Sequence, residues 1–79
     1  MSIKENWTFQ PEVLAEVYTA MEFATEVGIT YKIDNAVSSV QGDIHYLDCT
    51  THHIRVIDRN YCVQYIPLAS IISLQLIKE

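Results

Sequence analysis

Residues 28–34, GITYKID, decide the fold, because hydrophobic residues here begin to recur at every second position instead of every third or fourth. Ile29, Tyr31 and Ile33 alternate with polar neighbours, which is typical of a strand with one buried face. Residues 34–35, Asp-Asn, are the turn residues of a hairpin. The stretch therefore predicts that an antiparallel sheet starts here.

The same period continues toward the C-terminus and predicts four more strands. The second is long and holds Gly42 in its middle, where a glycine commonly marks the bend of a curved strand. Pro67 cannot donate a ladder hydrogen bond, so it should end the fourth strand, and residues 67–70 fit a short turn or a single 3₁₀ turn. The predicted strands after the first are residues 37–48, 51–58, 61–66 and 72–76.

Before the sheet, hydrophobic residues follow a helical period. Pro11 suits the first helical turn, and the negative charge of Glu12 favours the positive end of the helix dipole. The apolar residues form one stripe up to Val27, and Gly28 is placed as a C-cap glycine would be. We therefore expect a helix over residues 11–27.

These elements predict an α+β, mainly β fold in which an amphipathic helix precedes a strongly bent five-stranded antiparallel sheet, a small barrel of the SH3-like or Sm-like type. Residues 11–79 should form this single domain, and residues 1–10 a semi-ordered N-terminal arm. The predicted core is Val13, Leu14, Val17, Met21, Ile29, Tyr31, Ile44, Ile54, Val56, Val63, Ile72 and Leu74.

Composition narrows the classes of function. The chain has 79 residues, of which 49% are hydrophobic, and 10 acidic against 5 basic residues give a net charge of -5. This charge opposes direct binding to nucleic acid. The longest apolar stretch, residues 66–72, is far short of the roughly 20 residues that span a bilayer. With no targeting signal recognised, we expect a cytoplasmic protein with free thiols.

The run from Met21 to Leu76 carries several family features. These are the helix-to-ITY junction at residues 28–31, the G-x-I pair at Gly42 and Ile44, and the close formed by residues 66–68 and 71–72. In these features the chain resembles the YolD-like family of small bacterial and phage proteins. The resemblance implies an Sm-like barrel and a role as accessory protein to error-prone Y-family DNA-repair polymerases.

Residues that could carry chemistry gather around the predicted turn between the second and third strands. Zinc accepts imidazole and thiolate ligands, but the spacing matches no established zinc motif, so we predict no metal site. Two glycines and a small domain offer little for an oxyanion loop or an enclosed pocket, so we expect no catalytic residues, no cofactor and no enzyme activity. The candidates considered are His45, Asp48, Cys49, His52, His53 and Cys62.

The predicted helix carries a more distinctive surface. Its charged residues are all glutamates, and Phe23 projects near Glu12 and Glu16, away from the apolar stripe. An aromatic ring within an acidic face is suited to anchor a basic protein partner. We therefore predict partner-binding residues Glu12, Glu16, Phe23 and Glu26.

The first hypothesis is a non-enzymatic protein-interaction module whose partner, on the resemblance, is a repair polymerase. One alternative is an Sm-like homo-oligomer that binds nucleic acid by collecting Lys32, Arg55 and Arg59 from several subunits. Another is an acidic phage-type inhibitor whose carboxylates imitate nucleic-acid phosphates.

Overall fold

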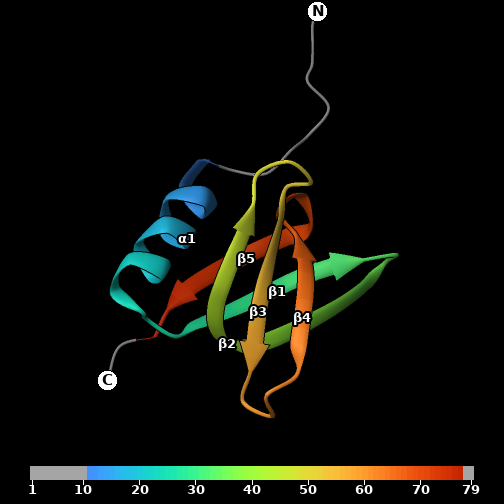
Figure 1. The fold of residues 1–79 in the computed structure, drawn as a ribbon. Coiled ribbons are helices and arrows are strands. Elements are labelled where there is room, and N and C mark those ends of the chain that lie inside the picture. The colour runs from blue at the N-terminus through green and yellow to red at the C-terminus, as the bar shows by residue number, and fades with distance from the viewer. Residues whose placement is uncertain (1–10, 78–79) are drawn as a thin grey trace, which may run out of the picture.

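The computed structural model describes residues 11–77, which fold into one helix, five strands and a short 3₁₀ turn (Figure 1). Residues 1–10, predicted to form the arm, lie outside the described residues, as do residues 78–79. In chain order the elements are α1 (Pro11–Phe23), β1 (Val27–Ile33), β2 (Ala36–Asp48), β3 (His53–Asp58), β4 (Val63–Pro67), η1 (Leu68–Ser70) and β5 (Ile71–Leu76). The predicted start of the helix, the five strands and the 3₁₀ turn are confirmed.

The strands form one antiparallel sheet in the order β4-β3-β2-β1-β5. Asp34 and Asn35 both have positive φ, at 53° and 68°, as a tight hairpin between β1 and β2 requires. The helix packs on β2 and β5. Among the described residues β4 and β5 are the two edges and do not pair with each other, so the sheet is open.

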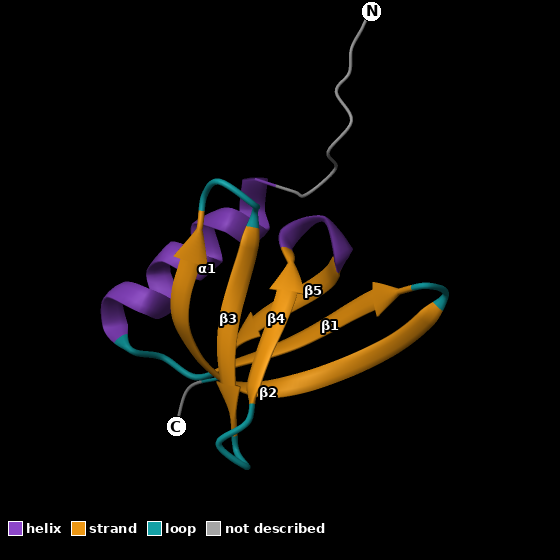
Figure 2. Cartoon of the chain, turned by 45° about the vertical axis from the view of Figure 1, so that its right-hand side comes forward, coloured by secondary structure: helices purple, strands orange, loops and turns teal. Residues whose placement is uncertain are grey.

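Gly42 is the point at which the sheet bends. Residues 36–42 of β2 pair with β1, and residues 42–48 pair with β3, so that Gly42 faces Val27 on one side and Asp58 on the other. Figure 2 shows β2 curving from one half of the sheet into the other. A Cβ atom at this position would meet the Ile57 carbonyl oxygen and lie 2.8 Å from the Asp58 Cα atom. The predicted bend at Gly42 is confirmed, and the close approach of the β3 backbone leaves no room for a side chain at this position.

The helix ends earlier than predicted. It stops at Phe23, and the Thr25 amide donates a 2.9 Å hydrogen bond to the Ala20 carbonyl across Ala24, whose φ is 52°. This is the arrangement of a Schellman cap, with alanine in the left-handed position that glycine usually takes. The expected end at Val27 is wrong, and Gly28 lies inside β1, where it pairs with Gln41 and Gln75.

The core lies between the helix and the concave side of the sheet. Of the predicted core residues, Met21, Val63 and Ile72 are exposed by 36%, 42% and 50%, so their assignment is wrong. Leu14 and Tyr31 are partly buried against the core. The buried hydrophobic residues are Val13, Val17, Ala20, Val27, Ile29, Ile44, Ile54, Val56, Ile66, Leu68, Ile71 and Leu74.

The register of the edge strands explains two of these errors. In β4, Ile66 pairs with the fully buried Ile54, so the inward positions are those in phase with Ile66 and the side chain of Val63 points outward. In β5, the pairing with β1 shifts between Thr30 and Tyr31, and Tyr31 faces Ile71 rather than Ile72. This bulge turns Ile72 out of the core.

Candidate functional site

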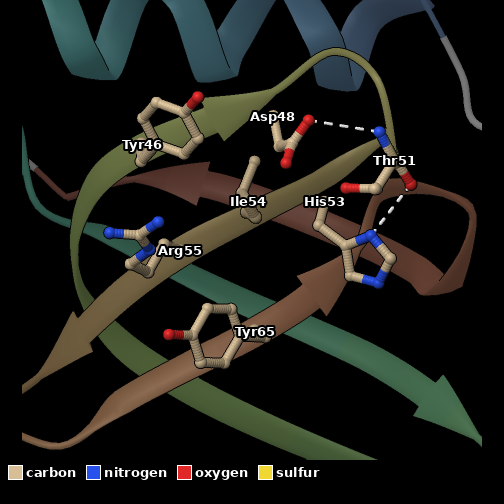
Figure 3. A pocket seen from close by; sticks show the side chains of 7 residues that line it. All are labelled: Tyr46, Asp48, Thr51, His53, Ile54, Arg55 and Tyr65. Carbon is tan, nitrogen blue, oxygen red and sulfur yellow. Dashed lines mark hydrogen bonds between the residues drawn. The ribbon is translucent and has the colours of Figure 1, made fainter.

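The outer face of β2, β3 and β4 carries an exposed row of three side chains. Arg55 in the middle of β3 pairs with Tyr46 of β2 on one side and with Tyr65 of β4 on the other. All three are exposed, with Tyr46 and Tyr65 at 48% and 64%. We call these three residues the tyrosine–arginine patch (Figure 3).

A bulge in β2 places Tyr46 in this patch. Ile44 faces the core opposite Val56, and strict alternation would also turn Tyr46 inward. The register shifts between Ile44 and Tyr46, which leaves His45 unpaired in the ladder and turns Tyr46 outward, while Leu47 turns toward the core. The patch was not found from the sequence, because neither residue type nor spacing signals this bulge.

The two tyrosine rings hold the guanidinium of Arg55 in place. The Arg55 Cζ atom lies 4.9 Å from the ring centroid of Tyr46 and 5.7 Å from that of Tyr65, distances typical of cation–π contacts. No acidic side chain within residues 11–77 forms an ion pair with Arg55. Its N–H donors are therefore available to an anionic group from outside the chain.

A shallow hollow of about 300 Å³ lies against the patch. Besides the three patch residues, it is lined by Ile54 and, toward the loop between β2 and β3, by Asp48, Thr51 and His53 (Figure 3). Its lining is mostly apolar. A volume at the lower limit for ligand sites suits one aromatic or aliphatic side chain rather than a whole substrate.

Hydrogen bonds fix the loop that closes the far end of the hollow. Asp48 Oδ1 accepts from the amides of Thr50 and Thr51 at 2.9 and 3.2 Å, and these bonds lower the pKa of the Asp48 carboxyl below its ordinary value of 3.8. The Nδ1 atom of His53 lies 2.8 Å from the Thr51 carbonyl oxygen. These hydrogen bonds therefore hold residues 48–53 in a defined conformation at one end of the hollow.

Asp58 organises the turn between β3 and β4 at the opposite end of the sheet. Its Oδ1 atom accepts from the amides of Asn60 and Cys62 at 2.8 and 3.0 Å, and its Oδ2 atom accepts from Gln64 Nε2 at 3.1 Å. The Cys62 amide and then the Gln64 side chain lower the pKa of this carboxyl below 3.8. The ionised form of Asp58 therefore stabilises the turn.

Stability should fall in acid for this reason. A carboxyl with a lowered pKa in the folded state stabilises the fold above its unfolded pKa, near 4, and this contribution is lost as the pH falls through the lowered pKa. We expect Asp58→Asn to lower the thermal midpoint by several degrees at pH 7 and by much less near pH 2, measured by circular dichroism. Asp34→Asn, in the exposed β1–β2 turn, controls for the loss of charge. A constant deficit from pH 7 to pH 2 would contradict the prediction.

Three of the predicted partner-binding residues lie on one flank of the helix. Glu12, Glu16, Thr19 and Phe23 follow at spacings of four, three and four residues, which places them in one stripe. Phe23 is 67% exposed, Glu12 is exposed and Glu16 is half-buried. No basic side chain within residues 11–77 pairs with either glutamate. We call Glu12, Glu16 and Phe23 the acidic helix patch.

Glu26 is separated from this patch because it follows the helix. Its carboxylate accepts two hydrogen bonds from Arg59, Nε to Oε2 at 3.0 Å and Nη2 to Oε1 at 3.2 Å. The Arg59 guanidinium accordingly lowers the pKa of Glu26 below its ordinary value of 4.5. This bidentate pair connects the start of β1 to the β3–β4 turn.

The histidines and cysteines considered for metal binding are not assembled into a site. Within the described part of the chain, no group of three His, Cys, Asp or Glu side chains could hold a metal ion. Cys49 and Cys62 are free and exposed. None of the described helices is long and apolar enough to cross a membrane.

The fold defines a small, mainly β domain of one helix and a five-stranded antiparallel sheet, with two exposed patches. The chain belongs to the YolD-like family, because the model of that family, described as YolD-like protein, matches residues 11–75. The resemblance found from the sequence is therefore confirmed. No curated protein matches the chain.

Proposed function

We propose that this chain is a non-enzymatic protein-interaction module that binds a basic surface of a protein partner through its acidic helix patch. The observation that carries the proposal is Phe23, an aromatic side chain left 67% exposed at the end of the helix, on the same stripe as two glutamates that have no basic partner within residues 11–77. Buried aromatic anchors within a charged rim often dominate the affinity of protein interfaces. The patch combines both elements on a rigid helix.

The family resemblance suggests the partner, a Y-family DNA-repair polymerase in the cytoplasm. A protein partner is favoured over nucleic acid by the charges of the described residues. Of the three cations that a nucleic-acid-binding ring would collect, Arg59 already pairs with Glu26. We also propose that the open sheet is a relative of the SH3-like and Sm-like barrels, which is supported by β5 lying beside β1 after a 3₁₀ turn.

The test measures binding of the purified chain to a purified Y-family polymerase by surface plasmon resonance. Phe23→Ala should weaken binding by about 30-fold, as expected for an interface anchor worth about 2 kcal/mol. Glu16→Lys should also weaken binding, and its effect should be larger at low salt than at high salt, since ions screen exposed charges. Both variants should keep the thermal midpoint of the unmodified chain.

Tyr18→Ala is the matched control. Tyr18 is an aromatic residue on the same helix, 52% exposed, and it lies on the other flank. This variant should change the affinity less than twofold. Equal losses for Phe23→Ala and Tyr18→Ala, or no binding to the polymerase, would overturn the proposal.

A further inference from the structure

The two halves of the sheet present different outer surfaces. Over β1 and its neighbours the outer hollow is lined by hydroxyl and amide side chains, among them Thr30, Ser39 and Ser73. Over β3 the outer surface is aromatic and carries a cation without an acidic partner among the described residues. The first is an ordinary solvated surface, whereas the second has the composition of an interface centre, where tyrosine and arginine are enriched.

The charges of the described residues indicate what fits this second surface. Arg55 is held between two rings with its donors unused by carboxylates of residues 11–77. Glu12 and Glu16 have no basic partner within the same residues. Within residues 11–77, one surface therefore carries a cation between aromatic rings without an acidic partner, and the helix carries carboxylates without a basic partner on the same stripe as an exposed ring.

We propose that the acidic helix patch of a second copy of this chain docks on the tyrosine–arginine patch of the first, so that copies associate head to tail. The carboxylate of Glu16 in one copy accepts hydrogen bonds from Arg55 of the other. The ring of Phe23 enters the hollow of about 300 Å³ beside Ile54. In the single chain Phe23 and the three residues of the tyrosine–arginine patch are exposed, and Glu16 is half-buried.

The spacing of the two patches is compatible with this contact. Glu16 and Phe23 are seven residues apart, about 10 Å along a helix axis. The hollow extends from Arg55 to His53, two residues or roughly 7 Å along β3, and continues to Thr51 in the turn before that strand. With the ring of Phe23 at the loop end and Glu16 over Arg55, the incoming glutamate also stays away from the negative charge of Asp48.

A second copy fits better than a nucleic-acid strand. The three cations among the described residues are Lys32, Arg55 and Arg59, and Arg59 is engaged by Glu26. A nucleic-acid strand would bring a negative charge with each nucleotide to a chain whose net charge is -5, whereas the helix brings its carboxylates to Arg55 alone. Because the contact joins two different patches, each pair of copies still has one free patch of each kind. Further copies can add there, which generates an open chain or, where the chain closes on itself, a ring.

If the proposed function holds, self-association and partner binding compete, because both cover the acidic helix patch. In the assembly the acidic helix patches would be covered by neighbouring copies. A basic partner that binds the patch more tightly would displace those copies and release single chains. Arg55→Glu should remove this competition without touching the surface that binds the partner.

Sedimentation velocity over a concentration series tests the contact. The unmodified chain should associate as concentration rises, and Arg55→Glu and Glu16→Arg should each weaken association at least tenfold. An equimolar mixture of the two variants should associate again, because each supplies the patch that the other lacks. Lys32→Glu and Glu22→Arg make the same changes of charge on exposed residues outside the contact and should associate like the unmodified chain.

Several results would overturn the inference. These are a monomer at every soluble concentration, association that both charge reversals leave unchanged, and a mixture that stays monomeric although each variant keeps its thermal midpoint. Binding of a labelled oligonucleotide that requires Arg55, in a chain that does not associate, would assign the patch to nucleic acid instead. Retention of polymerase binding by Arg55→Glu separates failure of this contact from failure of the proposed function.

Discussion

Replacing Gly42 with alanine is expected to cost about 3 kcal/mol or more of unfolding free energy, because the added methyl group has no room. Its Cβ atom would lie 2.8 Å from the Asp58 Cα atom and 2.9 Å from the Ile57 carbonyl carbon, and it would overlap the Ile57 carbonyl oxygen. These are backbone atoms of the paired strand, so the clash can be relieved only by separating β2 from β3. Small domains have total stabilities near about 5 kcal/mol, and this loss would unfold a large fraction of the molecules.

Gly28→Ala is the matched control for this substitution. Gly28 also lies in a strand, and a Cβ atom there would meet its nearest atom, Ile77 Cδ1, at an ordinary contact distance of 3.6 Å. The control should fold with a stability within about 1 kcal/mol of the original, since alanine also restricts the unfolded chain more than glycine does. Urea unfolding followed by circular dichroism measures both variants. Similar stabilities for the two would show that the bend does not require a glycine.

Ile71→Ala should cost about 2–4 kcal/mol, whereas Ile72→Ala should cost less than about 1 kcal/mol. The two residues are neighbours of identical type, so they differ only in the face on which the bulge places them. Ile71 is 7% exposed and contributes to the core, and Ile72 is 50% exposed. Urea unfolding of the two variants compares the costs directly.

The reverse order of costs would place Ile72 in the core and contradict the shift in pairing between Thr30 and Tyr31. Ile71→Val and Ile72→Val provide a milder pair for the case in which Ile71→Ala does not fold. Removing one buried methylene should cost about 1 kcal/mol at Ile71 and nearly nothing at Ile72.

Local sequence signals predicted the elements well. Pro11 marked the start of the helix, Asp34-Asn35 the first hairpin, Gly42 the bend and Pro67 the end of β4, and each acts through backbone geometry that depends on its own residue type. The helix end was misplaced because Ala24 takes a left-handed position for which Gly28 was the more usual candidate. A local rule fails where an uncommon residue adopts the required conformation.

The tyrosine–arginine patch depends on pairing between strands, about which the sequence contains less information. The bulge at His45 turns Tyr46 outward, and the one opposite Tyr31 turns Ile72 outward. Both are set by which residues pair across the sheet, so periodicity along one strand cannot locate them. The acidic helix patch was found from the sequence because a helical stripe needs no partner strand, but Glu26, beyond the helix end, instead pairs with Arg59.

The bend at Gly42 also has a consequence for how the domain opens. Because β2 supplies one half of its length to β1 and the other half to β3, neither hairpin can detach without breaking a strand that the other needs. The domain should therefore behave as a single foldon, with amides on both sides of Gly42 exchanging with solvent deuterium at one common free energy of opening. The shared strand makes cooperativity a property of the topology, since both hairpins are lost in the same step.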